Sequence, residues 1–210
     1  MVKVVDIVSE VSNESGGVRL RLLGWILVAA CLIGILIPVA ALTFSVRVTG
    51  LSMSPTLAPD DRLLMNVLAR DRVQRFDLVH VQFGNGRSMV KRVIGMPGDS
   101  VIVRINAGVP VVRVTPAGAD RARVVDNPAW TDQPGDNPRP CCGPDGLISG
   151  EPMRVTIPDG HYWVVGDNWG GSDDSRDYGF ITEAEIAATL NVRLLPWSGF
   201  GRIDNSVSLR

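Results

Sequence analysis

Residues 22–44 read LLGWILVAACLIGILIPVAALTF, and no side chain among them is charged. These 23 residues would form an α-helix of roughly 35 Å, at about 1.5 Å per residue, which is enough to cross a hydrocarbon core of about 30 Å. Trp25 and Phe44 lie near the two ends, where aromatic side chains favour the membrane–water interface. Pro38 is tolerated near the end of such a helix. We therefore expect a single N-terminal transmembrane helix.

Two other interpretations of this apolar stretch compete with an uncleaved anchor. The buried helix of a soluble protein needs fewer charge-free residues than are found here. A cleaved signal peptide is suggested by the small residues at 39–41, which resemble a cleavage site. Against cleavage, Asp6, Glu10 and Glu14 precede the stretch, and the stretch is longer than the roughly 7–15 residues of a signal-peptide core. We favour the uncleaved anchor.

The arginines on the two sides of the stretch differ slightly in number. Arg19 and Arg21 precede it, and Arg47 follows it. By the positive-inside rule, the more basic side stays in the cytoplasm. We expect residues 1–21 to be a cytoplasmic tail and residues 45–210 to form an extracytoplasmic domain, held at the plasma membrane by a single pass.

The composition of the chain excludes several other classes. The 210 residues carry 21 Lys and Arg against 22 Asp and Glu, a formal net charge of -1, whereas nucleic-acid-binding domains usually have a basic surplus. Hydrophobic residues at 45% and charged residues at 20% argue against disorder. The positive mean hydropathy of +0.16 comes from the apolar stretch. The 166 residues at 45–210 are enough to bury a core.

Residues 45–210 have the pattern of a mainly β domain. Short apolar or alternating runs are bounded by Gly, Pro, Asp or Asn, as is typical of strands separated by turns. The expected strands are 63–68, 78–83, 89–94, 101–105, 111–114, 154–157, 162–165 and 190–195. Only residues 182–188 look helical, with Thr182 and Glu185 forming a capping box.

Between residues 115 and 150 this pattern breaks down. Six prolines share the segment with several Gly and Asp residues, and they are Pro116, Pro128, Pro134, Pro138, Pro140 and Pro144. We expect a long, irregular surface excursion.

The three cysteines fall in two settings. Cys31 lies in the apolar stretch, whereas Cys141 and Cys142 are adjacent in the excursion. A zinc site needs further ligands at suitable spacing, and the two histidines, His80 and His161, have the pattern of ordinary strand residues. We therefore expect no metal. The sequence leaves open whether Cys141 and Cys142 are free, joined to each other, or joined between chains.

Three polar segments carry the candidate chemistry. They are VTGLSMSPTL at 48–57, followed by Asp60 and Asp61; VKRVIGMPGD at 90–99; and GDN at 166–168 with SDDSRDYG at 172–179. Each is weak evidence alone, because a serine in a turn flanked by Gly and Pro, or a polar loop after a strand, is usually structural.

Lys91 is the hardest of these residues to explain structurally. It stands with Arg92 between Val90 and Val93 in an apolar run, and period-two alternation places one of the two cations on the inner face. An inward lysine loses hydration, which lowers its pKa toward a neutral amine. A neutral lysine is a competent general base, and a serine hydroxyl such as that of Ser52 needs one to become nucleophilic.

Together and in this order, behind an N-terminal anchor, the segments resemble those of bacterial type I signal peptidases. These are membrane-anchored Ser/Lys proteases that remove signal peptides from exported proteins. The matching positions are Met53, 55–57, 91–95, 97–99 and 166–168. The resemblance covers most of residues 22–114 and 151–203, including Pro196 and Trp197. It implies a fold of antiparallel β-sheets behind a single transmembrane helix.

Carried over to this sequence, the resemblance makes Ser52 the nucleophile and Lys91 the general base of acyl-enzyme catalysis. The backbone N–H of Ser52 would stabilise the oxyanion. Many relatives have a hydroxyl residue two places before the nucleophile as a second donor. Here that position is Gly50, so the second donor is unassigned.

Five further residues would support this dyad. The resemblance implies that Ser172 holds the lysine amine in line. It also implies that Asp174 pairs with Arg176 and braces the loop. Asp167 would pair with Arg92 in a structural role.

The implied substrates are the signal peptides of exported preproteins, with small residues at the first and third positions before the cut, bound as an added strand. We expect Leu51, Met53, Pro55 and Met89 to contact the substrate, and Leu51 and Met53 to touch membrane lipid. Met89 replaces an aromatic residue that is common in relatives, and Trp-Gly-Gly at 169–171 also departs from the family pattern. Both departures leave room for an altered specificity.

Two rival functions share part of this pattern. Self-cleaving repressor-type proteases also use a Ser/Lys dyad, but they are soluble and carry a DNA-binding domain. A membrane-anchored, non-catalytic or narrowly specialised relative that acts as a binding module is disfavoured, because Ser52 and Lys91 are both present. Eukaryotic secretory relatives replace the lysine by histidine, and neither His80 nor His161 lies in the corresponding motif. We expect no cofactor, no metal and no nucleic-acid partner.

Overall fold

A computed structural model describes residues 3–131, 139–203 and 205–210. The chain separates into two compact units, Met1–Phe44 and Ser45–Arg210. All residues of the three polar segments belong to the second unit.

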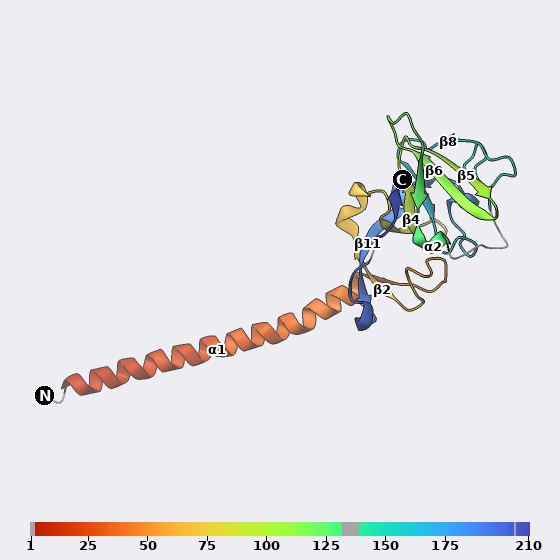
Figure 1. The fold of residues 1–210 in the computed structure, drawn as a ribbon. Helices are drawn as coiled ribbons and strands as arrows, with labels where there is room; N and C mark the ends of the chain where they lie inside the picture. The colour runs from red at the N-terminus through yellow and green to blue at the C-terminus, as the bar shows by residue number, and fades with distance from the viewer. Residues whose placement is uncertain (1–2, 132–138, 204) are drawn as a thin grey trace. The chain divides into compact units, whose positions relative to one another are not determined.

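The first unit is the helix α1, Lys3–Thr43, which is 41 residues long (Figure 1). Its part Leu20–Thr43 has 24 residues and a mean hydropathy of 2.7, and its most apolar window contains no buried residue. Pro38 lies inside the helix without ending it. The expected span at 22–44 falls on this part, except for Phe44, which follows the helix end. Length and composition therefore suit a membrane crossing.

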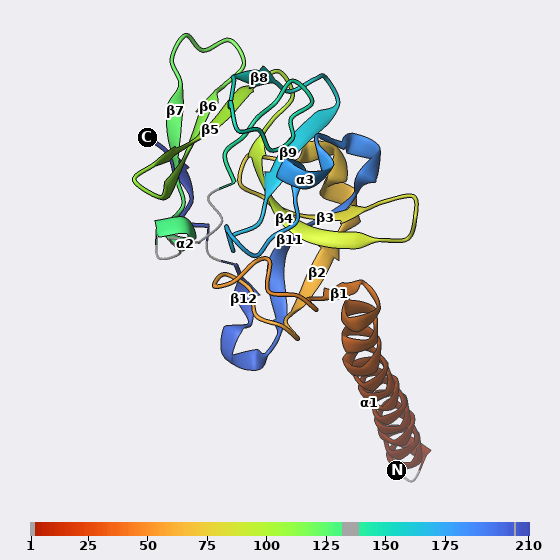
Figure 2. The same cartoon turned by 90° about the vertical axis from the view of Figure 1, so that its right-hand side faces the viewer.

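The second unit is built from two antiparallel sheets, and Figure 2 labels most of their strands. The larger sheet has eight strands in the order β1-β2-β11-β3-β4-β9-β10, with β12 pairing β11. Its strands are β1 Ser45–Arg47, β2 Arg62–Asn66, β3 Leu78–Gln82, β4 Ser88–Gly95, β9 His161–Val165, β10 Ile181–Thr182, β11 Ile186–Leu195 and β12 Gly201–Arg202. The smaller sheet has five strands in the order β13-β7-β6-β5-β8. They are β5 Ser100–Asn106, β6 Val109–Thr115, β7 Arg123–Asp126, β8 Val155–Thr156 and β13 Ser208–Leu209.

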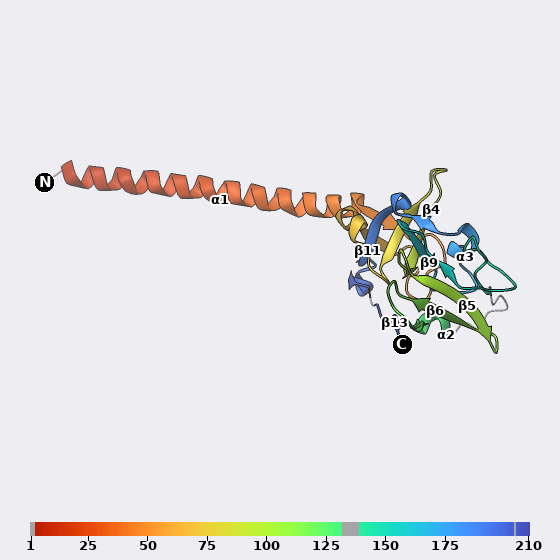
Figure 3. The ribbon, with the colours of Figure 1, turned by 90° about the horizontal axis from the view of Figure 1, so that it is seen from above.

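The hairpin of β5 and β6 is the longest in the smaller sheet (Figure 3). Asn106 pairs with Val109 at its end. The two residues between them, Ala107 and Gly108, have φ values of 50° and 82°. Two successive positive φ values belong to a type I′ turn, whose twist suits a two-residue hairpin connection.

Five short helical segments join the strands: η1 Val67–Arg72, α2 Pro128–Thr131, α3 Ser175–Tyr178, η2 Glu183–Glu185 and η3 Trp197–Gly199. The expected helix at 182–188 is wrong beyond its first turn. Thr182 and Glu185 do form a capping box, but β11 begins at Ile186. Pairing of β11 with both β2 and β3 outweighs the weak helical preference of this segment.

Three buried apolar clusters hold the second unit together. The cluster below the turn of Ser52 contains Val48, Met53, Leu57, Leu63, Leu78 and Leu190. A second cluster lies on the larger sheet and includes Val79, Val81, Val93 and Val164. The third draws on both sheets and includes Val101, Val103, Val112, Trp163 and Trp169. Each buried methylene group contributes about 0.8 kcal/mol, so the elements around Ser52 rest on a well-packed support.

The mainly β architecture expected from the sequence is confirmed, and every strand pair is antiparallel. Each of the eight expected runs contains a strand. The sequence pattern does not predict β1, β7, β10, β12 or β13. All of these have four residues or fewer, which is too short for a clear alternating pattern.

The segment 115–150 is less irregular than expected. Its described part contains β7 and α2, and the side chains of Val125 and Trp130 are buried. The expectation of a surface excursion is therefore wrong for these elements, because they contribute to the core. Pro134 and Pro138 lie outside the described residues.

Cys141 and Cys142 are joined to each other by a disulfide bond. Both are buried, and Cys141 forms isolated bridges with Val103 and Ile148. Cys31 is a free, exposed thiol. Of the alternatives that the sequence leaves open, the structure has the bond between neighbours.

Candidate active site

Ser52 lies in the turn that follows β1. The amide of Ser54 donates to the carbonyl of Leu51 at 3.0 Å, and the amide of Leu57 donates to that of Met53 at 2.9 Å. The side chains of Met53 and Leu57 are each 1% exposed. These two anchors fix the turn to the core, and the Ser52 hydroxyl lines a cavity.

Lys91, in β4, points its amine at Ser52. Its Nζ donates a hydrogen bond to Oγ of Ser52 at 2.7 Å, and the residue is 2% exposed. The expected alternation turns Lys91 toward Ser52 and Arg92 away from it, and Arg92 is also 2% exposed. The opposite face of β4 is covered too, and there Arg92 meets Asp167.

The pKa of Lys91 is lowered to about 8. Burial is the largest cause, because a desolvated ammonium is costly. The carboxylates of Asp174 and Asp173 oppose it by attraction and raise the pKa. Arg176 lowers it further, and Asp167 raises it by a smaller amount. With a pKa of about 8, roughly a tenth of the Lys91 side chains are neutral at pH 7.

Asp174 is the centre of a buried network in the loop between β9 and α3. It accepts from Arg176 Nε at 2.8 Å and Nη2 at 2.7 Å, from the Ser172 hydroxyl at 2.8 Å, and from the Gly166 amide at 3.0 Å. Burial alone raises the pKa of Asp174, but Arg176, the Gly166 amide and Ser172 outweigh it and the pKa is lowered. The expected ion pair between Asp174 and Arg176 is present. Arg176 also lies over the ring of Trp169, 4.1 Å from its centroid.

The hydroxyl of Ser172 is not hydrogen-bonded to the Lys91 amine, which is the contact that the resemblance implies. It donates to Asp174, while the Lys91 amine is bonded to Ser52. Gly166 shows how close these groups are. A Cβ at Gly166 would collide with both Ser172 Oγ and the carbonyl oxygen of Ser52. Ser172 and Ser52 therefore pack against the same Cα.

Asp167 and Arg92 form the second expected pair. Arg92 donates through Nε at 2.9 Å and Nη2 at 2.7 Å, one bond to each carboxylate oxygen. Thr56 donates to the same carboxylate at 2.5 Å and Asn127 at 3.0 Å. Asp167 is fully buried and joins β4, the Ser52 turn and the chain after β7.

Two residues to which the sequence assigned no role also hold this site together. The amide of Asn168 donates to the carbonyl of Ser52 at 3.0 Å. Arg139 is buried, and it donates to the carbonyl of Ser172 and the carboxylate of Asp177. Asn168 belongs to the GDN motif at 166–168. Arg139 lies in the Pro-rich segment, where no local sequence pattern indicates a role for it.

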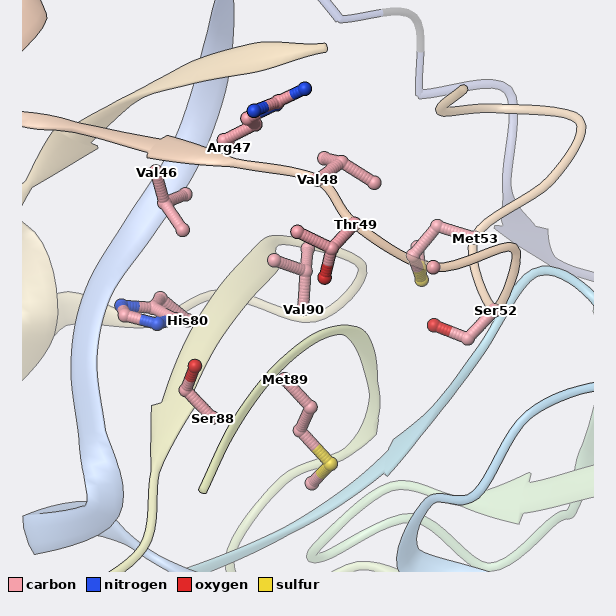
Figure 4. Close-up of a pocket in the computed structure, with 11 residues that line it drawn as sticks. Val46, Arg47, Val48, Thr49, Ser52, Met53, His80, Ser88, Met89 and Val90 are labelled. Carbon is pink, nitrogen blue, oxygen red and sulfur yellow. The ribbon is translucent and has the colours of Figure 1, made fainter. Parts of the chain in front are cut away.

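Two cavities meet at Ser52. The first, about 160 Å³, is lined by β1, the Ser52 turn, β3 and the start of β4 (Figure 4). The second, about 290 Å³, opens on the other side of the turn. Met53 lines the first cavity, Leu51 the second, and Met89 both; Pro55 lines neither. Because Met53 is buried, the expectation that it touches lipid is contradicted, whereas Leu51 is 60% exposed.

The backbone around Ser52 leaves room for a developing oxyanion. Among the described residues, the amide N–H of Ser52 donates to no acceptor. A Cβ at Gly50 would meet nothing within 4 Å, so the space beside the turn is open. One donor is thus available, and Gly50 has no side chain to supply a second.

His80, in β3, is a further residue that the sequence did not associate with the site. It pairs with Val90 in β4 and lines the first cavity. Both ring nitrogens are buried, and neither has a partner among the described residues. Burial lowers the pKa of the ring. The apolar pattern around His80 correctly indicates a strand but gives no sign of a cavity.

The arrangement suits attack on a carbonyl carbon. It combines a serine hydroxyl, a buried amine with a lowered pKa and an unengaged amide N–H, beside two cavities. Within the described part of the chain, no group of three or more His, Cys, Asp or Glu side chains is placed to hold a metal ion.

Comparisons with known proteins point to one family. The family model described as "Signal peptidase, peptidase S26" matches residues 19–197. A signal peptidase I of Bacillus caldolyticus is 29% identical over 161 residues, 73% of this chain and 80% of that protein. Signal peptidase IB of Staphylococcus aureus strain Mu50 is 29% identical over 183 residues, 86% of this chain and 93% of that protein. A crystal structure of a signal peptidase I from Enterococcus faecalis V583 aligns with a TM-score of 0.40 and 25% identity, over 56% of this chain and 96% of that chain.

Proposed function

The chain belongs to the type I signal peptidases of the peptidase S26 family, and from this premise we propose that it cleaves signal peptides from exported preproteins with a Ser52–Lys91 dyad. The observation that carries the proposal is the 2.7 Å contact between Lys91 Nζ and Ser52 Oγ. A buried lysine with a pKa of about 8 is suited to general-base work near neutral pH.

The proposed reaction has two halves. Neutral Lys91 accepts the proton of Ser52 as Oγ attacks the scissile carbonyl, and the Ser52 amide stabilises the oxyanion. Protonated Lys91 then passes this proton to the leaving amine, and the peptide bond breaks. In the second half Lys91 takes a proton from water as the water oxygen attacks the ester carbonyl. Lys91 then returns this proton to Ser52 Oγ as the bond between Oγ and the acyl carbon breaks, which releases the new carboxyl end of the signal peptide.

The loop after β9 is proposed to keep the amine in line. The Ser172 hydroxyl donates its hydrogen bond to Asp174, so its oxygen retains a lone pair that can accept a hydrogen bond from the Lys91 amine. Asp174 is in turn fixed by Arg176. Because these groups are buried, their hydrogen bonds hold Ser172 in one orientation.

The substrate is proposed to bind as a strand added to β4. Residues 88–90 pair with β3 on one side, whereas pairing with β9 on the other side begins at Arg92. The remaining edge offers backbone N–H and C=O groups to an extended peptide. Alternate side chains of such a peptide lie on one side, about 7 Å apart. The small residues at the first and third positions before the cut then enter the cavity that begins at Ser52.

The membrane-anchored chain is proposed to keep residues 1–21 in the cytoplasm and residues 45–210 outside. The apolar part of α1, Leu20–Thr43, supports the anchor. The excess of arginines before the span supports the orientation. Exported preproteins reach their cleavage site on the outer side of the membrane, so this orientation brings dyad and substrate to the same side.

The dyad is tested by cleavage of a preprotein in detergent by wild type, Ser52→Ala and Lys91→Met. We expect kcat/KM to fall by about 10³-fold or more in either variant, because each removes one half of the proton transfer. Lys3→Met and Ser198→Ala are matched controls outside the site and should keep wild-type rates. Circular dichroism of each variant checks that the fold is retained.

Two results would overturn parts of this proposal. Undiminished cleavage by Ser52→Ala or Lys91→Met excludes the dyad. A wild-type protein that cleaves none of a panel of exported precursors supports the rival function, a membrane-anchored binding module.

A further inference from the structure

His80 places an unsatisfied polar group in the wall of the first cavity. Both of its ring nitrogens are buried without a partner among the described residues. A buried polar group left unpaired costs about 1–3 kcal/mol. When such a group lies in a cavity wall, a molecule bound in the cavity can supply the missing hydrogen-bond partner.

The walls near His80 offer no strong partner of their own. Val46, Val90 and Met89 line the same cavity with apolar side chains. The hydroxyl residues Thr49 and Ser88 line it too, but neither is hydrogen-bonded to the His80 ring. The one charged side chain that lines it, Arg47, is held by Asp60 at 2.6 Å. Burial lowers the pKa of His80 below its ordinary value, so the ring is neutral at pH 7 and offers one N–H donor and one acceptor nitrogen.

His80 stands at the end of the cavity away from the nucleophile. Figure 4 shows the His80 ring and Ser88 at one end and Ser52 with Met53 at the other. A peptide whose scissile carbonyl lies at Ser52 sends the next side chain on the same side about 7 Å further along. That side chain belongs to the third residue before the cut, and it reaches the His80 end.

We propose that His80 makes this end of the cavity a polar subsite, selecting a hydroxyl side chain, Ser or Thr, at the third position before the cut. The proposal rests on the proposed function, because that function sets the position of the peptide. A hydroxyl can both donate and accept, so it can pair with either nitrogen of the neutral ring. It is also small enough for a cavity of about 160 Å³.

The test compares peptides that differ only at the third position before the cut, in the pairs Thr/Val and Ser/Ala. Thr and Val have nearly the same shape, so their kcat/KM ratio isolates the hydroxyl group. For wild type we expect ratios of about 3–10 in favour of the hydroxyl, the value of one net hydrogen bond. In His80→Leu the ratio should fall to about 1 or below, and in His80→Asn, which keeps a donor and an acceptor, it should stay above 1. His161→Leu is the matched control, and it should keep the wild-type ratio.

Binding of the same four peptides to the Ser52→Ala protein gives the ratios without catalysis. Equal affinities within both pairs, or an unchanged preference in His80→Leu, overturn the polar subsite. If His80→Leu does not fold, a loss of the preference in His80→Asn overturns it instead. Cleavage of all four peptides by wild type without a preference defeats this inference alone, whereas no cleavage of any peptide defeats the proposed function.

Discussion

In the proposed mechanism, the reactivity of Ser52 is set by how easily Lys91 loses its proton. The pKa of Lys91 is lowered to about 8, chiefly by burial, and only the neutral amine can accept the Ser52 proton. Below the pKa the neutral fraction falls tenfold per pH unit. We therefore expect kcat/KM to rise with pH through neutrality and to level off above about 8, as a pH–rate profile with a soluble peptide will show.

The sequence makes a direct measurement of this pKa simple, because Lys3 and Lys91 are its only lysines. In the full-length Lys3→Arg variant, isotope-labelled lysine gives an NMR signal from Lys91 alone. It should titrate at about 8 rather than near the ordinary value of about 10.4. A rate that is flat from pH 6 to 9, or a signal that titrates near 10, would contradict a lysine base.

Single residues of the site differ in how far the sequence reveals them. Ser52 and Lys91 stand in motifs whose residue types already indicate a nucleophile and a base. Arg139 and His80 show no such pattern, because their partners and surroundings come from distant parts of the chain. Arg139 reaches the Ser172 loop from a Pro-rich segment, and His80 lines a cavity that only the folded sheet creates. A local pattern can indicate a role that follows from residue type, whereas the roles of Arg139 and His80 depend on tertiary contacts.

At the scale of elements, the loop from β9 to α3 must pack tightly to support the dyad. A Cβ at Gly166 would collide with Ser172 Oγ and the Ser52 carbonyl oxygen. We expect Gly166→Ala to displace one or both groups and lower kcat tenfold or more. Overpacking of this kind also costs about 1–3 kcal/mol of stability. Peptide cleavage and thermal unfolding measure the two effects.

Gly170 provides the matched control in the same loop. A Cβ there would meet nothing within 4 Å, so Gly170→Ala should keep both the rate and the melting temperature of wild type. Equal behaviour of Gly166→Ala and Gly170→Ala would show that close packing at Gly166 is not needed for catalysis.

Elements also show why the fold is partly readable from sequence. The strands β5 and β6 are short runs rich in Val and Ile and are joined by a two-residue turn, so local pattern suffices. The strands β7 and β13 pair residues about 80 positions apart, Asp126 with Ser208, and no local signal records this. At 182–188 the capping box is real, but β11 begins at Ile186, where its pairing with β3 decides the structure.

For the whole molecule, several of the charges that nearly cancel in number are paired inside the second unit. The pairs of Arg92 with Asp167 and of Arg176 with Asp174 are fully buried, and Arg139 pairs with Asp177. Buried ion pairs add little stability compared with apolar packing, but removing one partner is costly. Their effect here is to fix the loops around Lys91, which has to be uncharged to act.

The proposed orientation of the chain rests on a small difference in charge. Arg19 and Arg21 precede the apolar stretch, and Arg47 follows it. Alkaline phosphatase fused after Arg210 should be active, because it folds only outside, and green fluorescent protein at the same place should be dark. In the double variant Arg19→Gln/Arg21→Gln the bias is lost, so we expect a mixed population in which both reporters give a signal.

The matched control for this prediction removes two arginines that do not flank the apolar stretch in the sequence. Arg70 and Arg72 are exposed and lie in η1, and Arg70→Gln/Arg72→Gln should leave both reporter signals as in wild type. A fluorescent wild-type fusion without phosphatase activity would place the dyad in the cytoplasm and contradict the proposed location. An unchanged orientation after loss of Arg19 and Arg21 would mean that the flanking arginines do not set it, since the positive-inside effect acts through charges close to the ends of a span.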